Sequence, residues 1–220
     1  MPLRGICFDL DGTLADTMPV CIQAFQATVE RLSGRRPGED EVSALFGINE
    51  EGMLEKLLPG RLAESLPEYL RQYEHFHAGG PRPFADVERL LELLQARGIR
   101  AAIVTGKGKF SAEISLRILD LCRRVDGVET GFADRSDKDG SIRAVLERWQ
   151  IPPQQAAYVG DTPYDMQAAR AAGVLPLGAA WAPTAHLLRE PAPEAAYTFY
   201  SLDEFIEWIE KNVEGELADR

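Results

Sequence analysis

Near its start the chain reads Gly5-Ile6-Cys7-Phe8-Asp9-Leu10-Asp11-Gly12-Thr13-Leu14. The apolar residues predict a buried strand over residues 3–9, and two carboxylates follow where that strand ends. In open α/β folds, the carboxyl ends of the strands form the edge at which ligands bind. Two close carboxylates repel each other and resist desolvation, so a bound cation is the simplest explanation for them. The alternative is that one Asp caps a helix and the other belongs to an Asp-Gly turn.

Composition limits the classes of protein to which the chain can belong. Its 220 residues, 45% hydrophobic and 27% charged, are typical of one globular domain or of one core with an insertion. A net charge of −11 argues against nucleic acid and anionic membranes as partners. There is no apolar run long enough for a membrane span, and we see no secretory leader. The three cysteines lack metal or redox spacing, so we expect a cytoplasmic protein.

A long helical region follows the first strand. Apolar spacing predicts helices over residues 17–32, 41–46, 50–58 and 61–76. The cluster Gly79-Gly80-Pro81-Arg82-Pro83 breaks this pattern and is interpreted as a linker that returns the chain to the sheet.

Beyond the linker, strands and helices alternate. Strands are predicted over 100–104, 128–132, 156–159, 174–177 and 197–199, and helices over 86–96, 111–121, 141–149, 163–172 and 202–213. Short loops between them indicate a doubly wound parallel α/β sheet. We therefore expect a core formed by residues 1–15 and 81–220, an inserted helical cap over 16–80, and a frayed tail over 215–220.

Three more polar sites lie beside predicted strands or helices. Thr105 follows a strand, Lys138 precedes a helix, and Gly160-Asp161-x-x-x-Asp165 follows another strand. Each has a simpler interpretation: Thr105 and Asp161 can cap helices, and Lys138 can be solvated. Their joint occurrence in this order favours a shared site.

In that order, Asp9-x-Asp11-Gly12-Thr13-Leu14, Thr105, Lys138 and Gly160-Asp161-x-x-x-Asp165 resemble the four motifs of the haloacid dehalogenase superfamily of phosphohydrolases. The helical insertion after the first motif is similar to the cap of its phosphoglycolate phosphatase-like branch. The resemblance covers nearly the whole chain. It implies a Mg²⁺-dependent phosphatase that acts on a small phosphorylated metabolite through an aspartyl-phosphate intermediate.

The resemblance also implies a role for each motif residue. Asp9 would be the nucleophile, Asp11 the general acid and base, and Lys138 the cation that neutralises the phosphate and Asp9. The implied Mg²⁺ ligands are the Asp9 carboxylate, the Asp11 carbonyl and Asp161, with Asp165 nearby. The implied phosphate donors are the Thr105 hydroxyl and the backbone N–H groups of Leu10, Asp11 and Gly106. Gly12 is expected to permit the tight turn between the two acids.

Two departures from related phosphatases stand out. Lys138 is followed by Asp139 and Gly140, where relatives often have Lys-Pro, and Trp181 is followed by Ala182, where they often have Trp-Gly. The second loop is expected to border the cap, so substrate contacts there can differ from those in the relatives.

The cap offers several candidates for closing over the site. Hinges are expected near Ala15-Asp16 and within 79–83, and cap contacts from the loop 47–49 or from Lys56 and Arg71. Lys107 and Lys109 can add positive charge near the site, but we interpret them as solvated lysines at a helix start. His75 and His77 are expected on different helix faces, which argues against a joint metal site.

The sequence leaves the substrate and one mechanistic alternative open. Phosphoglycolate, pyrophosphate, a sugar phosphate and a nucleoside 5′-monophosphate all remain candidates. A phosphosugar mutase is the rival on the same scaffold, although Thr13 favours hydrolysis. A catalytically inactive binding protein is a further alternative, and the intact motif residues argue against it. We expect a monomer or a homodimer.

Overall fold

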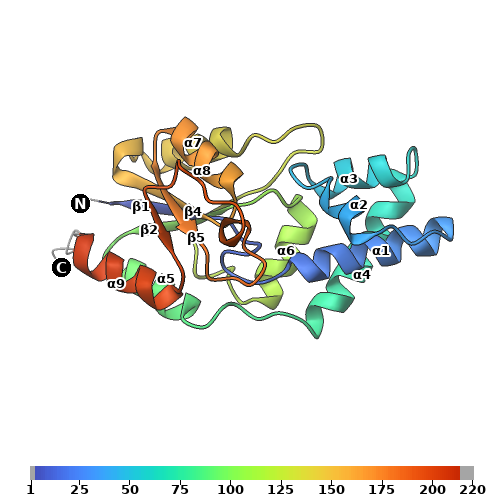
Figure 1. The fold of residues 1–220 in the computed structure, drawn as a ribbon, viewed down its shortest axis with the longest axis horizontal. Coiled ribbons are helices and arrows are strands. Elements are labelled where there is room, and N and C mark those ends of the chain that lie inside the picture. Colours follow the sequence, from blue (N-terminus) through green and yellow to red (C-terminus); the bar gives the residue numbers. More distant parts are fainter. Residues whose placement is uncertain (1–2, 214–220) are drawn as a thin grey trace.

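The computed structural model describes residues 3–213, and the expected tail over 215–220 lies outside them. Its centre is a parallel sheet in the order β3-β2-β1-β4-β5-β6 (Figure 1). The strands are β1 (Gly5–Phe8), β2 (Arg100–Val104), β3 (Gly127–Glu129), β4 (Ala156–Gly160), β5 (Leu175–Ala179) and β6 (Tyr197–Phe199). The predicted doubly wound α/β sheet is therefore confirmed.

The strand order reverses at β1. The chain runs from β1 to β2 and β3 on one side, and then returns to β4 on the other side. Phe8 pairs with Ile103 of β2 and with Val159 of β4, so all three strands end at the same edge. Such a reversal opens a crevice at the carboxyl ends of the strands, which is where open α/β sheets bind ligands.

Helices cover both faces of the sheet (Figure 1). They are α5 (Val87–Ala96), α6 (Lys109–Ile118), α7 (Lys138–Trp149), α8 (Pro163–Ala172) and α9 (Leu202–Asn212). Ile6 and Phe8 of β1 pack in one hydrophobic cluster with α5, α6 and α9, whereas Cys7 packs in the other with α7 and α8. This alternation buries both faces of β1, as expected for a central parallel strand.

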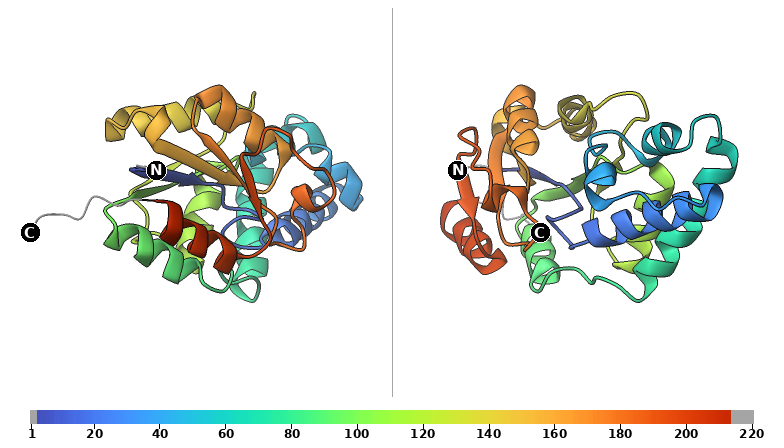
Figure 2. Two further views of the ribbon diagram at one scale, coloured as in Figure 1. Left: turned by 60° about the vertical axis from the view of Figure 1, so that its left-hand side comes forward. Right: turned by 45° about the vertical axis from the view of Figure 1, so that its right-hand side comes forward.

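Four helices between β1 and α5 form a second unit, which we call the helical unit. They are α1 (Met18–Ser33), α2 (Glu39–Ser43), α3 (Glu50–Leu57) and α4 (Leu62–Ala78). They enclose a hydrophobic cluster of their own, which includes Phe25, Met53 and Tyr69. The unit lies beyond the carboxyl edge of the sheet (Figure 2), and its two connections meet where Ala15 pairs with Pro83.

Several predicted boundaries were wrong by a few residues. The strand predicted over 128–132 is β3 at Gly127–Glu129, because the Gly131 N–H leaves the sheet and donates to the Lys107 carbonyl at 2.7 Å. The helix predicted over 141–149 begins at Lys138, where the Asp137 carbonyl accepts from the Ser141 N–H at 3.1 Å. Pro67 lies inside α4 without ending it.

Two further features were considered in the sequence: membrane-spanning segments and the state of the cysteines. Within residues 3–213, the structure contains no helix with both the length and the apolar character that a bilayer crossing requires. Cys7, Cys21 and Cys122 are free thiols, the first two of them buried.

Candidate active site

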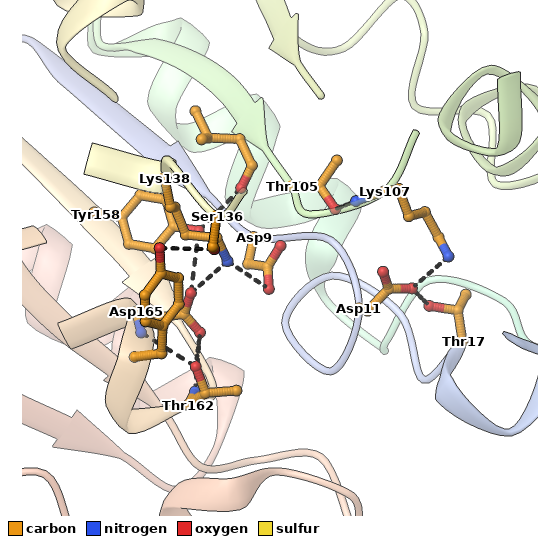
Figure 3. Close-up of polar contacts among 12 residues, drawn as sticks. Asp9, Asp11, Thr17, Thr105, Lys107, Ser136, Lys138, Tyr158, Thr162 and Asp165 are labelled. Carbon is orange, nitrogen blue, oxygen red and sulfur yellow. Dashed lines mark hydrogen bonds and ion pairs between the residues drawn. The ribbon is translucent and has the colours of Figure 1, made fainter. Parts of the chain in front are cut away.

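Asp9 lies directly after β1, at the edge where the strand order reverses. Its side chain is buried, and the residue is only 7% exposed. One carboxylate oxygen lies 3.3 Å from the Lys138 Nζ, and the other, Oδ1, is buried without a hydrogen-bond partner among the described residues (Figure 3). An unpartnered buried carboxylate oxygen is costly, so this atom points to a ligand.

Lys138 is held by a second carboxylate. Its Nζ lies 2.5 Å from Asp165 Oδ1, and the other oxygen of Asp165 accepts from the Thr162 N–H and hydroxyl at 3.0 and 2.7 Å. Thr162 and Asp165 form a reciprocal cap at the start of α8, so the helix start fixes the carboxylate that orients the lysine. The Tyr158 hydroxyl also approaches Asp165, at 3.4 Å.

Asp161 completes a group of three buried carboxylates. Asp9, Asp161 and Asp165 each offer an oxygen within 4.8 Å of the others. Gly12 makes room for Asp161: its φ is +76°, and a Cβ there would lie 2.5 Å from Asp161 Oδ2. The predicted tight turn at Gly12 is confirmed. Hard oxygen donors around an unpartnered Asp9 Oδ1 fit a divalent cation such as Mg²⁺.

The electrostatics of the group lead to the same conclusion. Burial raises the pKa of Asp9 to about 7; Asp165 and Asp11 add to the rise, and Lys138 opposes it. Burial, followed by repulsion from Asp165 and Asp9, raises the pKa of Asp161 well above its ordinary value. Burial disfavours the charged form of Lys138, but its carboxylate neighbours outweigh it and raise the pKa. Asp9 and Asp161 therefore resist ionisation together unless a further cation joins them.

Asp11 points away from Asp9. Its carboxylate accepts a hydrogen bond from the Thr17 hydroxyl and lies 3.3 Å from the Lys107 Nζ (Figure 3). The interpretation of Lys107 as a solvated lysine was wrong, because the residue is 5% exposed and also donates to the Cys21 thiol at 2.9 Å. The backbone turn after β2 directs the Lys107 side chain into the space between the helical unit and the sheet. Lys109 is exposed, as expected.

The residues predicted to bind phosphate lie around Asp9. Thr105 is buried directly after β2, and its hydroxyl accepts from the Lys107 N–H at 3.3 Å. The backbone N–H of Leu10 acts to lower the pKa of Asp9, against the larger effect of burial. Thr105 and Gly106 both line the pocket described below. The predicted residues Asp9, Asp11, Thr105, Gly106, Lys138 and Asp161 line this pocket, although the Asp11 carboxylate contacts Thr17 and Lys107.

The helical unit contacts the loops at the sheet edge through Asn49, which lies in the predicted contact loop 47–49, and through Glu50. The Asn49 N–H donates to the Phe132 carbonyl at 2.9 Å. Glu50, which we did not predict, is buried and accepts from the Gly108 N–H and the Ser111 hydroxyl. Asn49 caps α3, and a cap residue followed by an acid was the available signal.

Lys56 and Arg71, which we expected as candidates for cap contacts, lie elsewhere. Both are exposed, and Arg71 pairs with Glu68 of its own helix at 2.6 Å. The predicted difference between His75 and His77 is confirmed, because His77 is buried and His75 is exposed. The loop after β5 borders the helical unit as predicted, since the Thr184 hydroxyl donates to Asp16 at 2.7 Å.

A pocket of about 590 Å³ lies between the helical unit and the sheet edge. From the sheet side, Asp9, Thr105, Lys138 and Asp161 line it, together with Tyr164 at the start of α8. It has the size and the convergent polar groups of a small-molecule site.

Comparisons with known proteins agree with this geometry. The sequence profile of haloacid dehalogenase-like hydrolases matches residues 6–179. The chain is 32% identical to PpaX, a protein named as a pyrophosphatase, from Caldanaerobacter subterraneus, over 82% of this chain and 83% of that protein. It is also 32% identical to a phosphoglycolate phosphatase from Xylella fastidiosa, over 83% of this chain and 82% of the relative.

Solved structures show the same architecture. The haloacid dehalogenase-like hydrolase SP0104 from Streptococcus pneumoniae matches with a TM-score of 0.73 and 26% identity, over 94% of this chain and 99% of that chain. CbbY from Rhodobacter sphaeroides, solved in complex with phosphate, matches with a TM-score of 0.79 and 21% identity, over 94% of this chain and 96% of that chain. The CbbY match concerns the fold alone.

Proposed function

Because the chain belongs to the haloacid dehalogenase-like hydrolase family and is a phosphatase, we propose that it hydrolyses a small phosphorylated metabolite with Mg²⁺ as cofactor. The observation that carries the proposal is the environment of Asp9. This carboxylate lines the pocket, with one oxygen beside Lys138 and the other unpartnered among the described residues. It also lies in one group with the buried acids Asp161 and Asp165. That arrangement suits a nucleophile better than a structural acid.

In the first step, an Asp9 carboxylate oxygen attacks phosphorus. The new P–O bond gives an aspartyl-phosphate, and the bond from phosphorus to the leaving oxygen breaks. Asp11 donates a proton to that oxygen, which requires its side chain to turn from Thr17 towards the pocket.

In the second step, Asp11 takes a proton from water, whose oxygen attacks phosphorus. The bond between phosphorus and Asp9 breaks, and the carboxylate is restored together with free phosphate. Lys138, held by Asp165, neutralises charge on the transferred group, and Thr105, Leu10, Asp11 and Gly106 donate hydrogen bonds to its oxygens.

We assign the metal ligands from the family resemblance, supported by the group of three buried acids. Asp9, Asp161 and the Asp11 carbonyl would hold Mg²⁺, with Asp165 within reach of the same place. Bound there, Mg²⁺ would reduce the repulsion between the anionic nucleophile and the anionic phosphate. The unpartnered Asp9 Oδ1 supports this assignment.

We further propose that residues 16–80 form a cap domain that moves over a core of residues 1–15 and 81–220. The separate hydrophobic cluster of the helical unit supports this, as does the pairing of Ala15 with Pro83, which brings both connections together. Closure would exclude bulk water during the attack of Asp9 on phosphorus and complete the contacts to substrate.

We propose a cytoplasmic enzyme that acts as a monomer or homodimer, with neither nucleic acid nor a membrane as partner. Free Cys7, Cys21 and Cys122 suit a reducing compartment. The net charge of −11 disfavours polyanionic partners.

The test is the release of free phosphate from a panel of phosphorylated metabolites that includes phosphoglycolate, pyrophosphate, sugar phosphates and nucleoside 5′-monophosphates. We expect release that requires Mg²⁺ and stops with a chelator. Transfer of phosphate between positions of a sugar, with no free phosphate, would indicate a mutase instead. Activity that persists in excess chelator would remove Mg²⁺ from the proposal.

A further inference from the structure

The two walls of the pocket differ in chemistry. The sheet side contributes the charged residues around Asp9. The helical unit also contributes Ser43 and Glu50, but Glu50 accepts hydrogen bonds from the Gly108 N–H and the Ser111 hydroxyl. The rest of this wall is largely apolar: Met18, Cys21, Phe25, Phe46, Ile48, Met53 and Tyr69. Since phosphate binds beside Asp9 in the proposed function, the rest of the substrate faces this apolar wall.

Among the residues that the structure describes, none offers the pocket a free positive charge for a second anionic group. Among the described residues that line it, Lys138 and Lys107 are the only lysines or arginines, and Lys138 serves the phosphate. Lys107 is already paired with Asp11, and its positive charge also favours the ionised form of the buried Glu50. Diverting it to a substrate anion would remove the partner of the Asp11 carboxylate. Glu190 adds negative charge to the same lining, and exposed His186 is its only histidine.

The basic residues of the helical unit face outward. Their guanidinium groups pair with acids on the surface of the same unit, and their side chains are well exposed. They are Arg31 with Glu68, Arg35 with Glu41, Arg36 with Glu30, Arg61 with Glu64 and Arg71 with Glu68. Lys56 is exposed and outside the pocket lining. A carboxylate or phosphate at the apolar wall would thus lose water without gaining a partner.

Aromatic rings are present on both walls. Phe46 belongs to the helical unit, and Tyr164 belongs to the start of α8. Tyr164 is 40% exposed, and its hydroxyl accepts from Ser136 at 2.8 Å, which restrains the ring at the pocket. Rings on two walls suit a flat or apolar leaving group.

We propose that the substrate is a monophosphate whose leaving group is uncharged and carries an aromatic or apolar part, rather than a compound with a second anionic group. This inference rests on the proposed function and narrows its substrate. It predicts that the enzyme does not prefer phosphoglycolate or pyrophosphate, because the leaving groups of both compounds are anionic.

A matched pair of esters tests the inference on the wild-type enzyme with Mg²⁺. Benzyl phosphate and 4-carboxybenzyl phosphate are both esters of benzylic alcohols, and differ by one carboxylate. We expect kcat/KM for benzyl phosphate to exceed that for the carboxylated ester, and for phosphoglycolate and pyrophosphate, by at least about tenfold, because the anionic groups would be desolvated without a partner. Equal or better turnover of any anionic compound would overturn the inference and leave the phosphatase proposal intact. Release from none of the four would overturn the inference, and release from no compound of the metabolite panel would also overturn the phosphatase proposal.

A charge placed in the apolar wall gives a second readout. Phe46→Arg should shift the ratio of kcat/KM towards 4-carboxybenzyl phosphate by at least about tenfold, because it supplies the missing cation. Tyr200→Arg is the matched control: that ring is 64% exposed and outside the pocket lining, so the ratio should stay unchanged. An unchanged ratio in a folded Phe46→Arg protein would contradict the proposed position of the leaving group.

Discussion

The two walls of the pocket use charge in opposite ways. At the sheet edge, acids and a lysine are buried within contact distance of each other, and Lys138 lies between Asp9 and Asp165. In the helical unit, the arginines pair on the outer surface, and Glu50 is the charged residue among the described residues of its largely apolar pocket wall. The difference assigns phosphate chemistry to the sheet edge and recognition of the leaving group to the helical unit.

The largest expected effect comes from Asp9→Asn at the sheet edge. We expect kcat/KM to fall by at least about 10³-fold, because the amide is not a competent nucleophile. The variant should keep its circular dichroism spectrum and, without Mg²⁺, lose none of its thermal stability, since a buried carboxylate is replaced by a neutral isostere. Activity within tenfold of wild type would remove Asp9 from the chemistry.

Lys138→Met tests the cation of the same wall. It leaves the buried carboxylates of Asp9 and Asp165 without their shared partner, and we expect kcat to fall by about 10²- to 10³-fold. Lys109→Met is the matched control because Lys109 is exposed, and its kcat should stay at the wild-type value. Similar losses in both variants would mean that the effect of Lys138 is not specific to the site.

Asp11→Asn tests whether this carboxylate turns from Thr17 to protonate the leaving group. We expect about a 10²-fold loss with an alkyl phosphate, whose alkoxide needs a proton, and a much smaller loss with 4-nitrophenyl phosphate, whose phenolate leaves unaided. Equal losses with both esters would contradict the general-acid role. Single-turnover kinetics with the two esters gives the comparison directly.

The raised pKa of Asp9 predicts an unusual pH dependence of stability. Burial raises it from 3.8 to about 7, so between these values the folded state binds more protons than the unfolded state. The metal-free protein should therefore lose stability as pH rises through this range. Mg²⁺ should increase Tm more at pH 8 than at pH 5, since a divalent cation favours the ionised acids. A Tm increase that is independent of pH, measured by differential scanning fluorimetry, would contradict this coupling.

The smallest expected effect lies on the outer surface of the helical unit. Arg71→Ala removes an exposed pair with Glu68, and we expect no measurable change in kcat/KM for any ester, because surface ion pairs contribute little. A clear change in the preference between benzyl and 4-carboxybenzyl phosphate would show that an outward-facing cation reaches the substrate.

The sheet edge and the helices of the helical unit were readily predicted from the sequence, and the contacts between the two were not. Asp9, Thr105 and Asp161 each follow a strand that has a clear apolar pattern, and parallel strands bring their carboxyl ends to one edge. The burial of Lys107 and Glu50 depends on how the helical unit packs against the loops after β2 and β3. No local pattern encodes that packing, so a lysine beside a helix start was interpreted as solvated.

The most direct test of the account is to trap the phosphorylated enzyme. The protein should be mixed with Mg²⁺ and an ester that it hydrolyses, and quenched in acid during the steady state. It should then be reduced with borohydride and digested for mass spectrometry. Borohydride reduces an acyl phosphate to an alcohol, so the account predicts homoserine in place of Asp9 and not in place of Asp11. An enzyme that releases phosphate under these conditions while Asp9 is recovered unmodified and another residue carries the label would contradict it.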